Sequence, residues 1–234
     1  MKRVLGSLFV LCLAIQSYAA PFQNLGFDEA ITNRLSPADP PFHDGLGTSI
    51  DLLPGWQLFL GTNPVSAVGM NWKVPGFGFA SLYNQAYNQD VPRWFEGLYL
   101  GLLPGQDTGS NVIEAPFSLV QTGDIPADAA SIHFLSYNQR PELKLNNAVL
   151  PVTYNYFAPG PAAPVFEGVA DVSAFAGQTV ELEFTTPTSF LFHGLDSISF
   201  SPQIIPEPGP RMLFGLGGAA LWAMFKLRMR PQIT

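Results

Sequence analysis

Cysteine is almost absent from this sequence of 234 residues, which contains a single one, Cys12. Cys12 lies inside an apolar stretch near the N-terminus, so the rest of the chain carries no thiol. A body without cysteine forms no disulfide, offers no thiolate to a metal and has no cysteine nucleophile. The stability of this body must therefore come from packing and hydrogen bonding.

Positive charge is also scarce. The chain has 11 Lys and Arg residues against 18 Asp and Glu residues, which gives a formal net charge of −7. Positive charge gathers in the first twenty residues and in the segment from Pro206 onward, so the body between them carries a net charge of about −12. We predict that such an acidic body binds neither nucleic acid nor anionic lipid surfaces. It is compatible with cations and with neutral polysaccharide.

Catalytic motifs are missing as well. His43, His133 and His193 are scattered, and the sequence has neither a His-Glu-x-x-His pair nor a Gly-x-Ser-x-Gly turn. His133 lies in a strand pattern, where a packed histidine is a better interpretation than a base. The many acidic residues single out no pair for glycosidase chemistry. We predict that the protein is not an enzyme, and keep an unrecognised polysaccharide hydrolase as the third hypothesis.

A secretory signal occupies the N-terminus. Residues 1–20 contain two basic residues, an apolar core from Val4 to Ile15, and small residues at positions −3 and −1 of a cut after Ala19. This pattern is typical of a signal peptide that is removed at Ala19 or Ala20. We therefore predict export through the Sec machinery and exclude this segment from the fold.

The C-terminal segment, residues 204–231, is built in three parts. Its apolar run from Met212 to Phe225 would span about 21 Å as a helix, which is short for a hydrocarbon core of about 30 Å. Snorkelling flanks extend it to one predicted transmembrane helix over about residues 211–227. The alternative is a buried helix of a soluble domain. A Pro-Glu-Pro motif precedes the run and a basic membrane stop follows it: Pro206, Glu207 and Pro208, then Lys226, Arg228 and Arg230.

This three-part order resembles the PEP-CTERM sorting domain of Gram-negative bacteria. The resemblance implies an exosortase as partner, a membrane peptidase or transpeptidase that recognises Pro206, Glu207 and Pro208 and removes the tail. Arg211 and the residues after Arg230 depart from the usual pattern, which bears on the efficiency of processing more than on identity. The body before Pro206 is then expected outside the inner membrane.

The body, residues 21–203, is predicted to be one all-β domain. Its 22 Gly and 22 Pro residues, counted over the whole chain, separate short strand patterns. The clearest strand is Val180 to Phe184, where apolar and polar residues alternate. A hairpin is predicted from Leu143 to Tyr156 around the Asn146-Asn147 turn. Further strands are predicted at Trp56–Leu60, Leu98–Leu102, Phe117–Gln121, Ile132–Tyr137, Val169–Val172 and Ile198–Phe200.

Four loose motifs in this body resemble the galactose-binding-like jelly rolls of carbohydrate-binding modules. They are Asn24–Asp28, Leu53–Trp56, Asp171–Val180 and Leu195–Phe200. The resemblance implies a single jelly-roll β-sandwich. It also implies that Asp28 and Asp196 meet at a structural calcium ion, because their positions match those acidic residues in the family. The alternative is that both carboxylates cap turns.

An aromatic and amide-rich stretch gives a candidate glycan site. Trp72, Tyr83, Tyr87 and Trp94 are interleaved with Asn and Gln residues. Aromatic faces stack on sugar rings while amides bind hydroxyl groups, as in many ligand sites. The alternative, which we favour, is that these rings fill the core of a β-sandwich.

The sequence thus predicts an exported, non-catalytic protein of the cell surface or extracellular matrix. Its precursor would be held in the inner membrane, and the processed body would lie at the surface or outside a Gram-negative cell. The alternative is a carbohydrate-binding module for an extracellular polysaccharide. No cofactor is predicted, and structural Ca²⁺ is kept as the alternative that the jelly-roll resemblance implies.

Overall fold

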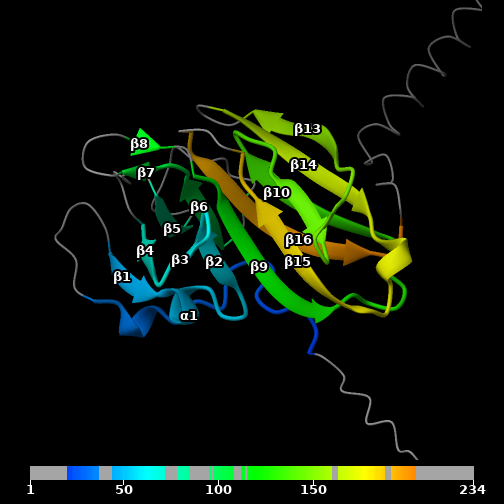
Figure 1. Cartoon of the computed structure of the whole chain (residues 1–234), viewed down its shortest axis with the longest axis horizontal. Helices are drawn as coiled ribbons and strands as arrows, with labels where there is room; N and C mark the ends of the chain where they lie inside the picture. The colour runs from blue at the N-terminus through cyan, green and yellow to red at the C-terminus, as the bar shows by residue number, and fades with distance from the viewer. Residues whose placement is uncertain are drawn as a thin grey trace, which may run out of the picture.

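The computed structural model describes residues 20–36, 44–71, 78–84, 95, 97–107, 112–113, 115–159, 163–187 and 191–203. The predicted signal peptide up to residue 19 and the predicted tail from residue 204 lie outside these ranges. The described residues form a β-sandwich of two large sheets with short helical turns at its rim (Figure 1). The prediction of an all-β body is confirmed.

The larger sheet, called sheet B, has eight strands within the described residues. Strands β4 and β5 pair in parallel, and the other described pairs of this sheet are antiparallel. Its order is β1 (Gly45–Thr48), β4 (Ala67–Met70), β5 (Phe79–Asn84), β6 (Leu98–Leu103), β16 (His193–Ser201), β10 (Ser131–Tyr137), β14 (Pro164–Asp171) and β13 (Thr153–Pro159).

The smaller sheet, called sheet A, packs against it with six described strands. Its order is β12 (Ala148–Val149), β11 (Glu142–Leu145), β15 (Thr179–Thr185), β9 (Phe117–Asp124), β2 (Gln57–Leu60) and β3 (Asn63–Pro64). A separate two-stranded ribbon and three helical turns complete the described elements: β7 (Gln106–Asp107), β8 (Val112–Ile113), α1 (Ser49–Leu52), η1 (Thr32–Arg34) and η2 (Ser173–Phe175).

Strand β15 follows the predicted alternation. Val180, Leu182 and Phe184 are buried between the sheets, while Glu181 and Glu183 point to the other face. Successive side chains of a strand point to opposite faces, so this one alternation fixes which residues reach the core. The strand predicted at Val180 to Phe184 is confirmed.

The predicted hairpin is correct at its turn and wrong beyond it. Asn146 and Asn147 adopt φ angles of 48° and 65°, the left-handed conformation that a tight hairpin turn requires and that Asn tolerates. The return strand ends at Val149, and the next strand begins at Thr153 in the opposite sheet. Pro151 lies in the break; it lacks the N–H that a continuing strand would need.

A chain of aromatic rings crosses the core between the sheets. Phe27 packs on Trp56 at 6.0 Å between ring centroids, and Trp56 packs on Phe184 at 6.5 Å. Phe184 meets Phe134 edge-on at 4.9 Å, and Phe134 meets Tyr154 edge-on at 6.0 Å. These contacts join the N-terminal segment to sheet A and then to strand β13, at one end of the strand order of sheet B.

The two ends of the described body approach each other, because residues close to each end are in contact. The Ala20 carbonyl accepts a hydrogen bond from the Asp124 amide, and the Ser201 carbonyl accepts one from Ala130. The rings of Phe22 and Phe200 stack at 5.5 Å between centroids. The described residues contain no helix of the length and apolarity that crossing a membrane requires, and the predicted span lies outside them.

Candidate functional site

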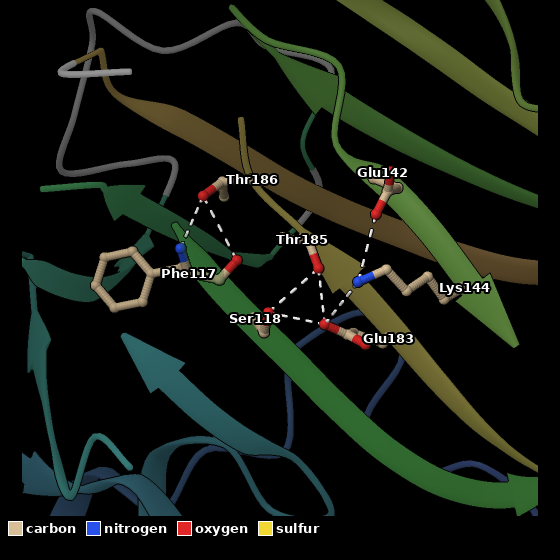
Figure 2. Close-up of polar contacts among 7 residues, drawn as sticks. All are labelled: Phe117, Ser118, Glu142, Lys144, Glu183, Thr185 and Thr186. Carbon is tan, nitrogen blue, oxygen red and sulfur yellow. Dashed lines mark hydrogen bonds and ion pairs between the residues drawn. The ribbon is translucent and has the colours of Figure 1, made fainter. Parts of the chain in front are cut away.

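A polar cluster lies on the outward side of β9, β15 and β11 in sheet A (Figure 2). It consists of five side chains from three strands, and we call it the Glu183 cluster: Ser118, Glu142, Lys144, Glu183 and Thr185. Oε1 of Glu183 accepts hydrogen bonds from the Ser118 and Thr185 hydroxyls, each at 2.8 Å, and lies 3.4 Å from Nζ of Lys144. Lys144 also lies 3.3 Å from Oε1 of Glu142.

These contacts stabilise the charged forms of Glu183 and Lys144. Burial by itself raises the pKa of Glu183, but the hydrogen bonds from Thr185 and Ser118 and the charge of Lys144 outweigh it, so the pKa is lowered. Burial likewise opposes the charge of Lys144, while Glu183 and Glu142 raise its pKa. Because three donors at Oε1 stabilise its ionised form, the Glu183 carboxylate is a weak base. The Glu183 cluster therefore joins β9, β15 and β11.

A second set of polar contacts lies on the outer face of sheet B. Oγ of Ser131 is 2.9 Å from Nε2 of His133, and Nδ1 of His133 is 3.3 Å from Oε1 of Glu167. Ser131 also donates a hydrogen bond to the carbonyl of Gln203. Sequence reasoning singled out His133 but missed both partners. The available signal was the two-residue spacing of Ser131 and His133, which places them on one face of a strand.

The order of these contacts is that of a serine–histidine–acid set, but the direction of the hydrogen bonds is not. The one hydroxyl proton of Ser131 is donated to Gln203, so Ser131 can only accept from Nε2 of His133. An activated serine instead donates its proton towards the histidine. Ser131 is moreover fully buried. The three side chains thus attach the last described segment to sheet B, and the geometry provides no activated nucleophile there.

Asp28 lies at the start of strand β6. Its Oδ1 accepts a hydrogen bond from the Leu98 amide at 2.7 Å. Gly97 precedes it with φ +67°, and a Cβ atom at Gly97 would lie 2.1 Å from Asp28 Oδ1. In the same opening segment, the Leu25 carbonyl accepts from the Ile198 amide at 3.2 Å. Asp28 therefore accepts a hydrogen bond from the first amide of β6, and its segment links β6 to β16.

Asp196 lies in β16, beside the same end of β6. The β16–β6 pairing ends at Leu195 and Leu100, and Asp196 follows directly, with a side chain that is 1 % exposed. Ser197, the next residue, has φ 54° at a bulge in the strand. The fold thus places Asp28 and Asp196 at one junction, although the two are far apart in sequence.

This junction supplies only part of a calcium site. Calcium takes six to eight oxygen ligands, and the described residues contain no group of three or more His, Cys, Asp or Glu side chains that could hold a metal. Backbone carbonyls and water would have to complete the set around Asp28 and Asp196. The site stays a prediction: titration calorimetry of the chelator-treated protein should show Ca²⁺ binding that Asp28→Asn and Asp196→Asn weaken. Absence of binding by the wild type would remove it.

Of the four glycan candidates, Tyr83 is described, whereas Trp72, Tyr87 and Trp94 lie outside the described residues. Tyr83 is 3 % exposed, because Tyr99 stacks on its ring at 5.4 Å and Phe192 meets it edge-on at 5.6 Å. Burial raises its pKa to about 12, and a hydrogen bond with Ser81 opposes that rise. An open sugar-stacking role does not fit Tyr83, whose surroundings match the packing alternative.

Tyr83 belongs to a buried group of rings on the outer face of sheet B, which we call the outer aromatic cluster: Tyr83, Phe95, Tyr99, Tyr137 and Phe192. Gly101 and Gly194 face each other in register beneath these rings. A Cβ atom at Gly101 would come within 2.4 Å of Phe192. The paired glycines therefore let the rings lie directly on the backbone of the sheet.

A small cavity lies between the sheets near His193. Its volume is about 10 Å³, room for about one water molecule. His193 is 4 % exposed, and burial lowers its pKa to about 4, so the ring is neutral at physiological pH. A cavity of this size does not hold a sugar or an organic cofactor.

Comparison with known proteins adds little to this geometry. No protein-family model and no curated protein matches the chain. Among solved structures, the K1 cleaved adhesin domain of Lys-gingipain from Porphyromonas gingivalis W83 is similar with a TM-score of 0.41 and 11% identity, covering 67% of this chain and 96% of that one. The enzymatically active domain of tailspike protein 4 from bacteriophage CBA120 has a TM-score of 0.37 and 11% identity, covering 73% and 22%. Likenesses this weak carry no conclusion about activity or ligand.

Proposed function

We propose that this chain is an exported, non-catalytic β-sandwich protein of the cell surface or extracellular matrix, sorted by an exosortase. The observation that carries the proposal is the three-part order at its C-terminus. Pro206, Glu207 and Pro208 begin a few residues after the last described strand, β16, and precede the apolar run and the basic cluster. In this proposal the sandwich has a jelly-roll arrangement of the galactose-binding-like type.

The position of the two ends of the described body supports this proposal. The body begins at Ala20 beside Asp124 and ends beside Ser131, on either side of the β9–β10 connection. Ends on one side of the domain would allow the signal peptide, before its removal, and the C-terminal anchor to meet the same membrane. Removal of the two signals would leave the sandwich intact.

The proposal is tested by replacing the motif in the source organism. The triple change Pro206→Ala, Glu207→Ala, Pro208→Ala should leave a membrane-bound precursor that keeps residues 212–234. Wild-type protein should start near Ala20 and end near the motif, as measured by intact-protein mass spectrometry of membrane and medium fractions. Mass beyond that of the peptide would indicate covalent attachment.

A matched control uses the similar residues Pro37, Asp39 and Pro40 of the body, whose replacement by alanine should not alter the tail. If the tail were removed from the motif variant as it is from the wild type, the processing proposal would be wrong. Retention of residues 212–234 by the wild-type protein would contradict it as well and would indicate a permanently anchored protein instead.

A further inference from the structure

One cation of the described body is held by aromatic rings instead of by a carboxylate. Three basic residues are described: Arg34 pairs with Asp51 at 2.9 Å, and Lys144 pairs with Glu142 and Glu183. Arg140 forms no salt bridge within the described ranges. Its guanidinium carbon lies 4.5 Å from the ring centroid of Phe166 and 5.7 Å from that of Tyr154, distances typical of cation–π contacts.

The surroundings of Arg140 fix its position at the surface. Arg140 is exposed and lies in the connection between β10 and β11, and the Tyr154 hydroxyl donates a hydrogen bond to the carbonyl of Pro141 next to it. Tyr154 in turn packs edge-on against Phe134 of the core. Arg140 therefore lies next to the last ring of the aromatic chain of the core, and the rings of Tyr154 and Phe166 orient its planar guanidinium group.

An exposed ring continues this surface. Tyr156 of strand β13 is the direct cross-strand partner of Phe166, so both side chains point to the same face of sheet B. Tyr156 is 63% exposed, and β13 is the last strand of sheet B among the described residues. We call Arg140, Tyr154, Tyr156 and Phe166 the edge shelf.

We propose that the edge shelf binds a hexuronic acid residue of an acidic polysaccharide. A guanidinium group held in a fixed orientation can form a bidentate pair with a carboxylate. Arg140 has no carboxylate partner in the described body. The exposed Tyr156 ring offers a flat apolar face for the sugar ring beside that carboxylate. Charge and stacking together select a sugar that carries a carboxylate over a neutral sugar.

The acidity of the body does not prevent this binding. At physiological ionic strength the Debye length is about 8 Å, so exposed carboxylates farther away are largely screened from a ligand at Arg140. The carboxylates close in sequence to the edge shelf already have partners: Glu142 lies 3.3 Å from Nζ of Lys144, and Glu167 lies 3.3 Å from Nδ1 of His133. The site rests on the proposed surface or matrix location, where such a polysaccharide would be met.

The test is calorimetric titration of the full-length protein in detergent with a short oligogalacturonate. Wild-type protein should bind it, and Arg140→Ala should weaken binding about tenfold or more because a charge-assisted hydrogen-bonded pair is lost. Tyr156→Ala should weaken binding about threefold to tenfold, whereas Tyr156→Phe, which keeps the ring, should bind like the wild type. The methyl-esterified oligomer, which lacks the charge, should bind at least about tenfold more weakly than the acid.

Arg34→Ala is the matched control, since it removes an exposed arginine that already has a carboxylate partner. Equal losses for Arg34→Ala and Arg140→Ala would mean general charge attraction and would overturn the proposal. The proposal would also be overturned if the wild type bound the methyl ester as tightly as the acid, or did not bind the acid at all. A concentration-dependent dimer through β13 that the oligogalacturonate does not dissociate would overturn it as well. Thermal unfolding of each variant identifies loss of fold. Tail processing is measured separately by mass, so its failure is distinguishable from failure at the edge shelf.

Discussion

The two outer faces of the sandwich carry the same strand alternation but very different surroundings. On sheet A the outward residues form the Glu183 cluster, which is polar and partly exposed. On sheet B the outward residues include Tyr83 and Tyr99, which are buried in the outer aromatic cluster. Sheet B therefore has buried side chains on each face: the main core against sheet A, and the outer aromatic cluster on the other face. Alternation shows that a residue points away from the main core, and says nothing about what covers it.

The largest expected effect of this difference is at Tyr99. It is fully buried between Tyr83 and Phe95, with centroids 5.4 and 5.1 Å away. Tyr99→Ala should lower the free energy of unfolding by about 3–5 kcal/mol, because it opens a cavity in a packed aromatic group. Urea-induced unfolding followed by circular dichroism measures this change.

The control for Tyr99 is an outward residue of the other sheet. Thr122 of β9 is exposed, so Thr122→Ala should change the free energy of unfolding by no more than about 0.5 kcal/mol. A cost below about 1 kcal/mol for Tyr99→Ala would show that the outer aromatic cluster is not a packed second core. The comparison of the two faces would then fail.

A smaller effect is expected at Glu183. Glu183→Gln should lower the free energy of unfolding by about 1 kcal/mol near neutral pH, because the charged acceptor of the cluster is lost. The pKa of Glu183 is lowered from its ordinary value of 4.5, so its stabilising contribution is complete above that value and is lost as pH falls through the folded-state pKa. The difference between wild type and variant should therefore shrink when unfolding is measured at about pH 3 instead of about pH 7.

Glu181→Gln is the control on the same face of the same strand. Glu181 forms no ion pair among the described residues, so this change should have an effect of no more than about 0.5 kcal/mol at either pH. Equal effects of the two substitutions would mean that the Glu183 cluster adds nothing beyond exposed charge. A pH-independent difference at Glu183 would contradict the role of its ionised form.

Parts of the fold followed from local sequence. The alternation of Val180, Leu182 and Phe184 predicted β15 and its buried face, and Asn146 and Asn147 predicted a tight turn. These predictions succeed because strand alternation and left-handed turn residues are local properties. The strand predicted to continue past Val149 was wrong, since the chain passes to the other sheet at Pro151.

The candidate sites depended on contacts between distant segments. Asp28 and Asp196 were paired by resemblance alone, and the strand register explains why both reach one end of β6. Arg140 was not singled out by the sequence, because a lone arginine in a turn has no local signature. Its position above Phe166 appears only when β14 is folded beside the turn.

The sequence by itself determined the chemistry available to this protein: no thiol in the body, an acidic surface, alternating strands, and a sorting-like order at the C-terminus. Tertiary structure decided which residues those features expose. It buried Tyr83 beneath other rings, left Tyr156 exposed on the last described strand of sheet B, and gave Lys144 two carboxylates while Arg140 has none within the described residues. The physical reason is that exposure and pairing are set by the register and order of strands far apart in the chain, which composition and spacing do not encode locally.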